Sequence, residues 1–113
     1  MKPVPALKWP GATWSQAPWV VSHFVPTSVY LETCLGSAAA LAHKPPSPSE
    51  VANDLDDQVV NFFQVLRDQP AALAEAVSLT PWSRTEWRTA RAELDAEATP
   101  LERARRFVVM ATQ

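Results

Sequence analysis

Apolar residues recur at helical spacing in the second half of the chain. One such stripe begins beside Asp54 and Asp56, and either carboxylate is suited to the free N–H groups of a first helical turn. The stripe consists of Leu55, Val59, Phe62, Phe63 and Leu66. This spacing predicts a long amphipathic helix whose apolar stripe is buried.

Further helix starts follow along the chain. Pro70 is suited to a first helical position, where its missing N–H is not needed. Residues 83–86 and 99–102 each have the pattern of a capping box, with Ser or Thr at the start and Glu three positions later. Together these signals predict that residues 57–113 form a helical region without a strand.

The first half has a different pattern. Residues 28–31 form a β-prone run, Gly36 and Ser37 open an Ala-rich helix, and residues 51–52 are a second short apolar run. This order predicts a strand, a turn, a short helix, a loop and a strand. Residues 1–56 are therefore expected to form a partial cofactor-binding α/β unit.

A short helix is also expected ahead of this unit. Ser15 is placed to cap a helix that runs to about Phe24, and Pro18 fits only its first turn. The side chains at helical spacing that would face the core are Trp19, Val20, His23 and Phe24. Pro26 would end the helix.

Composition and charge narrow the classes of function. The chain has 113 residues, and its 47% hydrophobic content with five Trp predicts one packed domain. The formal charge of −2 indicates no basic face for nucleic acid. The single Cys34, with no signal peptide or long apolar run, predicts a cytoplasmic protein that does not contact a membrane.

Few side chains form a recognisable chemical constellation. His23 and His43 have no ligand partners at metal-site spacing, so no metal is expected. Arg84, Arg88 and Arg91 share one helical face, which is either a solvated charged face or a phosphate contact. The sequence leaves both interpretations open.

Several segments together resemble the Dam-like class of adenine-specific DNA methyltransferases. Residues 7–11, LKWPG, are similar to that family's K-W-x-G-G-K motif, and residues 30–39, YLETCLGSAA, to its cofactor motif Y-x-E-P-F-x-G-[GS]-[GA]-A. Residues 53–56, NDLD, and residues 60–68, VNFFQVLRD, are similar to its N-D-x-[DN] motif and the helix that follows. Residues 80–86, TPWSRTE, resemble a downstream T-P-Y-S-R-E-E.

The resemblance implies a fold class, a ligand and a reaction. The fold would be α/β, the N-terminal part of a Rossmann-like S-adenosylmethionine-dependent methyltransferase fold followed by a helical region. The reaction would be methyl transfer to adenine N6 in DNA, which makes DNA a partner. By position, Trp9 would line the cofactor, Glu32 and Gly36 would sit in its loop, and Asp54 would hold the ribose.

Departures from the family pattern bear on activity. Thr13 stands where a second lysine is usual, and Thr33 and Cys34 replace Pro-Phe. The [DNS]-P-P-[YFW] motif is absent, because the Pro-Pro pair at residues 45–46 follows a lysine and precedes a serine. We therefore expect a methylase fragment that has no catalytic residue and is inactive alone, with a complementing polypeptide or self-association. The alternative is a non-enzymatic binding or interaction protein that retains the scaffold.

Overall fold

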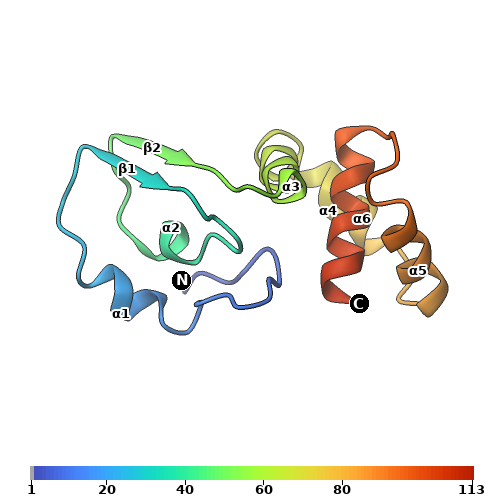
Figure 1. Ribbon diagram of the computed structural model, residues 1–113, viewed down its shortest axis with the longest axis horizontal. Coiled ribbons are helices and arrows are strands. Elements are labelled where there is room, and N and C mark those ends of the chain that lie inside the picture. Colours follow the sequence, from blue (N-terminus) through green and yellow to red (C-terminus); the bar gives the residue numbers. More distant parts are fainter. Residues whose placement is uncertain (1) are drawn as a thin grey trace. The chain divides into compact units, whose positions relative to one another are not determined.

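The computed structural model describes residues 2–113. Contacts within the chain define two units, Met1–Leu55, named the strand unit, and Asp56–Gln113, named the helical unit. Figure 1 shows both strands in the first unit and the longest helices in the second.

The strand unit is a parallel β-α-β arrangement with a preceding helix. Its elements are α1 (Ala17–Val21), β1 (Val29–Glu32), α2 (Ala39–His43) and β2 (Ser49–Ala52). The strands pair in parallel, with Val29 opposite Ser49 and Glu32 opposite Ala52. Parallel strands require a crossover, and the segment that contains α2 supplies it.

The expected Rossmann-like fold class is wrong. The sheet found in residues 2–113 has two parallel strands, in a small mixed chain that is about 47% helix. All the regular elements from Asp57 onward are helices, so no further strand extends the sheet. Leu31 and Val51 lie on one face of it and are 60% and 49% exposed, whereas a Rossmann-like parallel sheet is covered on both faces.

The helix expected from Ser15 to about Phe24 is shorter than predicted. It spans Ala17–Val21 only, with Pro18 in its first turn. Trp19 is 69% exposed and Phe24 is 41% exposed, so the prediction that these side chains face the core is wrong. A helix of little more than one turn cannot direct a continuous stripe of side chains inward.

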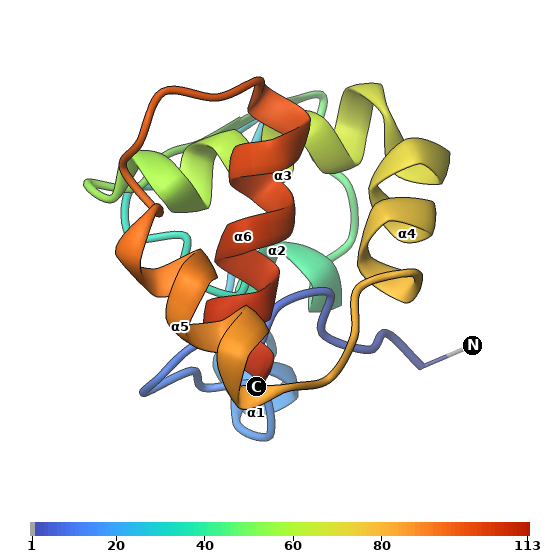
Figure 2. The same ribbon diagram turned by 90° about the vertical axis from the view of Figure 1, so that its right-hand side faces the viewer.

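The helical unit is built around its last helix. Its elements are α3 (Asp57–Asp68), α4 (Pro70–Ser78), α5 (Arg84–Ala92) and α6 (Pro100–Thr112). Helix α6 packs against the other three, and Figure 2 shows it with α5 on one side and α4 on the other. Phe62 and Phe107 are buried between these helices, with ring centroids 6.3 Å apart.

Three of the predicted capping residues begin their helices, whereas Ser15 does not, because the N-cap of α1 is Gln16 and makes no side-chain cap bond. The Asp56 carboxylate accepts a hydrogen bond from the Gln58 N–H at 2.8 Å. The Ser83 and Thr99 hydroxyls each accept one from the N–H three residues later, which is one half of a capping box. The Ser83 N–H donates to Gln113 Oε1 at 3.3 Å and not to Glu86, so the reciprocal half is not formed there. Leu55, however, is 97% exposed rather than buried, because α3 begins two residues after it. Within residues 2–113, no helix is both long enough and apolar enough to cross a membrane.

Candidate functional site

A cavity of about 390 Å³ lies beside the carboxyl ends of the two strands. All four residues that the resemblance assigned to the cofactor line it, namely Trp9, Glu32, Gly36 and Asp54. Glu32 is the last residue of β1, and Asp54 follows β2 by two residues. Parallel strands bring their carboxyl ends to one edge of a sheet, which explains why these residues meet.

Hydrogen bonds tie the two strand ends together at this cavity. The Gly36 N–H donates to Asp54 Oδ2 at 2.9 Å. The Asn53 N–H donates to the Glu32 carbonyl at 2.8 Å, and the Leu35 N–H donates to the Asn53 carbonyl at 3.0 Å. The loop after β1 is therefore fixed against the segment after β2, and its bond to a carboxylate is of the stronger, charge-assisted kind.

Gly36 is required by both backbone conformation and space. Its φ of +50° lies in the left-handed region, which glycine adopts without a steric penalty. A Cβ at this position would lie 3.0 Å from Trp9 Cδ1. The indole of Trp9 therefore reaches the loop from the N-terminal arm and packs directly on the Gly36 backbone.

The cavity wall is negatively charged. The Tyr30 hydroxyl donates to Glu32 Oε2 at 3.1 Å. Burial raises the pKa of Glu32, while the Tyr30 hydrogen bond and the Lys44 charge act in the opposite direction. Burial, together with the Glu32 charge, raises the pKa of Tyr30 to about 12, so Tyr30 remains a donor at neutral pH. The lining residues described here include the carboxylates of Glu32 and Asp54 and no Lys, Arg or His.

Some lining residues were not assigned from the sequence. Thr13, Cys34 and Ser37 also form the wall, and Ser37 is buried. Cys34 is exposed, with its sulfur 3.9 Å from Thr33 Oγ1. The signal that could have indicated these residues is their position within or beside the two motifs that carry Trp9 and Gly36.

The histidines do not belong to this cavity. His23 and His43 each contact a backbone carbonyl one turn earlier through Nδ1, those of Trp19 and Ala39. Over residues 2–113, no group of His, Cys, Asp and Glu side chains could hold a metal ion.

Comparison with known proteins assigns no family to the chain. No family model matches it, and no curated protein matches it.

Gly36→Ala should destabilise the strand unit more than Gly11→Ala. Both glycines have positive φ, +50° and +76°, so each substitution carries the penalty of a left-handed alanine, about 1–2 kcal/mol. Only at Gly36 does the added Cβ also meet Trp9, whereas at Gly11 it meets no atom within 4 Å. Denaturant unfolding followed by NMR of the Trp9 indole N–H measures the difference. Equal losses in the two variants would contradict the proposed packing.

Proposed function

We propose that the strand unit binds S-adenosylmethionine in the cavity beside Gly36, as part of a DNA adenine methylase-like protein. The observation that carries this proposal is the convergence of Trp9, Glu32, Gly36 and Asp54 on one cavity. Its volume of about 390 Å³ is within the usual range for small-molecule sites.

The charge of the wall favours this cofactor over a phosphate-bearing dinucleotide. Phosphate groups are bound by glycine-rich loops, helix N-termini or cations. The lining residues described here include no cation, and the loop after β1 contains one glycine. The sulfonium and ammonium groups of S-adenosylmethionine are attracted by carboxylates such as Glu32 and Asp54.

Each of the four residues is suited to one part of this ligand. The Asp54 carboxylate is an acceptor for ribose hydroxyls, and the absence of a Cβ at Gly36 permits close approach of the backbone. The Trp9 indole offers an apolar surface to the adenosine, and Glu32 offers a carboxylate to the cationic end. When bound, S-adenosylmethionine supplies an activated methyl group.

We further propose that the chain does not methylate DNA by itself. Its sequence contains no [DNS]-P-P-[YFW] segment, which by resemblance would hold the amino group of the target adenine. Val29, Leu31 and Val51 are exposed on one face of the sheet, which supports packing of a complementing polypeptide or a second copy there. A cytoplasmic location, and DNA as the methyl acceptor, belong to the same proposal.

Calorimetric titration with S-adenosylmethionine tests the cofactor site. The native chain should bind weakly, and Asp54→Ala should weaken binding by about tenfold or more, because a charge-assisted hydrogen bond contributes roughly 1.5–3 kcal/mol. Asp57→Ala, which removes an exposed carboxylate in the first turn of α3, is the control and should change nothing.

Three results would contradict these proposals. If the native chain did not bind S-adenosylmethionine, the proposed cofactor site would be wrong. If Asp54→Ala bound S-adenosylmethionine as tightly as the native chain, Asp54 would have a structural role, such as its contact with Gly36, and no role in binding. Transfer of labelled methyl to DNA by the native chain alone would contradict the expected lack of activity.

A second candidate function, contact with nucleic acid, is favoured by the charge distribution on α5. The carboxylates of this region are directed to α6, where Glu86 pairs with Arg105 at 2.7 Å and Glu93 pairs with Arg106 at 3.4 Å. The exposed side chains of α5 include Arg84, Arg88 and Arg91. None of these three forms an ion pair with a carboxylate in residues 2–113. A net charge of −2 therefore conceals a local basic face.

Two of these arginines are held in place by an aromatic ring. The guanidinium carbons of Arg84 and Arg91 lie 5.8 Å and 5.2 Å from the ring centroid of Trp87. The Trp87 indole N–H donates to the Met110 carbonyl at 3.3 Å, which fixes the ring on α6. Arginines held in this way lose less conformational entropy on binding, and we propose that they contact phosphates.

Replacement of all three arginines by alanine should weaken binding to a labelled DNA duplex in fluorescence anisotropy. The salt dependence should also become shallower, by about one logarithmic unit per lost phosphate contact. Arg67→Ala is the control, because Arg67 is exposed and already pairs with Asp68 at 2.6 Å. If the triple variant and Arg67→Ala gave equal affinities and equal salt slopes, the basic face of α5 would be a solvated surface.

A further inference from the structure

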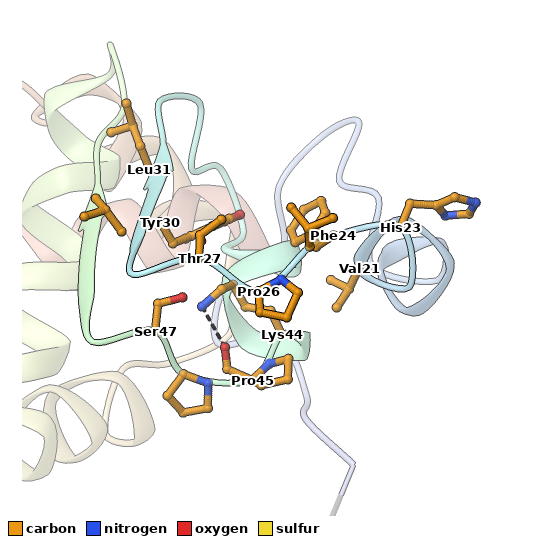
Figure 3. A pocket seen from close by; sticks show the side chains of 13 residues that line it. Val21, His23, Phe24, Pro26, Thr27, Tyr30, Leu31, Lys44, Pro45 and Ser47 are labelled. Atoms are coloured by element: carbon orange, nitrogen blue, oxygen red, sulfur yellow. Dashed lines mark hydrogen bonds between the residues drawn. The ribbon is translucent and has the colours of Figure 1, made fainter.

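A second cavity lies toward the amino-terminal ends of the same two strands. Its volume is about 720 Å³, and it shares no lining residue with the first cavity. Its wall is formed by the segment between α1 and β1, by β1, and by the loop between α2 and β2. Figure 3 shows the Lys44 side chain among the lining residues. The ring of His23 points away from the Lys44 side chain.

Lys44 places a buried positive charge in this wall. Its side chain is 5% exposed. The ammonium donates hydrogen bonds to the Pro45 carbonyl at 2.8 Å and to the Glu50 carboxylate, and it lies 4.5 Å from the centroid of the Tyr30 ring. An ammonium has three N–H groups. One N–H of Lys44 therefore has no oxygen partner in the described part of the chain, and the Tyr30 ring is the further contact of the buried ammonium.

The rest of the wall is predominantly apolar and rigid. The ring centroids of Phe24 and Tyr30 lie 5.8 Å apart, and Pro26 and Pro45 contribute further apolar surface. Proline restricts backbone motion, so these parts of the wall lose little entropy when a ligand binds. Among the residues that line this cavity in the described chain, none is Asp or Glu.

We propose that this cavity binds a small amphiphilic anion, namely an aromatic or branched aliphatic carboxylate. The apolar body of the ligand lies against Phe24, Pro26 and Pro45, and its carboxylate accepts the remaining N–H of Lys44. This site is distinct from the S-adenosylmethionine site, because the two cavities have no lining residue in common, although the Tyr30 hydroxyl links their walls through Glu32.

Substitutions of Glu50 and of Lys44 should affect ligand binding in opposite directions. Its carboxylate already holds the Lys44 ammonium, and its side chain is 32% exposed. A ligand carboxylate therefore competes with Glu50 for the same positive charge. Removing the charge of Glu50 should strengthen ligand binding, whereas removing the charge of Lys44 should weaken it.

Titration of the full chain with naphthoate, followed by amide NMR, tests this site, and neutral naphthamide is the matched probe. Naphthoate should cause saturable shifts in residues 21–31 and 44–47 and should bind about tenfold more tightly than naphthamide, as one charge-assisted hydrogen bond predicts. Lys44→Met keeps the apolar stem and should remove this preference, and Lys44→Arg should retain it. Glu50→Gln should tighten naphthoate binding several-fold without affecting naphthamide.

Several results would contradict a carboxylate site at Lys44. Absence of saturable shifts in these residues, or shifts spread over both units, would overturn the site. Equal affinities for the two probes in the native chain would show that Lys44 only closes the loop through Glu50. If Lys44→Met does not fold, the response of Glu50→Gln to the two probes decides the question.

Discussion

The hydrogen bond from the Gly36 N–H to the Asp54 carboxylate joins the two loops on which the candidate cofactor site depends. It adds a side-chain link to the backbone hydrogen bonds of Asn53 that already join the loop after β1 to the segment after β2. The same glycine lets the Trp9 indole pack on the backbone, because any Cβ would meet that ring. One backbone N–H and one missing Cβ therefore set the position of three of the four candidate residues.

Charge separates the two cavities of the strand unit. The cavity at the carboxyl ends has two carboxylates and no cation in its described wall, whereas the one toward the amino-terminal ends has Lys44 and no carboxylate. The charged lining residues of the two cavities therefore differ in sign, although the Lys44 charge is already paired with the Glu50 carboxylate. The ligands proposed for them differ accordingly, one cationic at its reactive end and the other anionic.

Local signals in the sequence identified three helix starts and failed at Ser15, where Gln16 is the N-cap instead. Asp56, Ser83 and Thr99 begin their helices as predicted, because a cap requires only a side-chain oxygen and an N–H two or three residues away. The four site residues could be selected from motif resemblance, and the parallel strands bring them together. The cavity around Lys44 could not be predicted, since Pro26, Tyr30 and Lys44 share no motif and meet only in the folded chain.

Tertiary context explains the predictions that failed. The Rossmann-like fold class rested on motif order alone, and motif order does not supply the additional strands that such a sheet needs. Leu55 matches the helical period but precedes the helix, so it is exposed. The basic face of α5 arises because Glu86 and Glu93 form ion pairs with two arginines of α6, Arg105 and Arg106. These pairs form only in the folded chain, so the net charge of the sequence does not reveal them.

The hydrogen bond from the Gly36 N–H to the Asp54 carboxylate shapes the cavity proposed for the cofactor. The most direct measurement is the amide proton shift of Gly36 through an acid titration, between about pH 2 and pH 6, where carboxylates change charge. We predict a large shift that follows protonation of the carboxylate and is lost in Asp54→Ala. A Gly36 amide that does not respond to pH, or that responds equally in Asp54→Ala, would contradict the account.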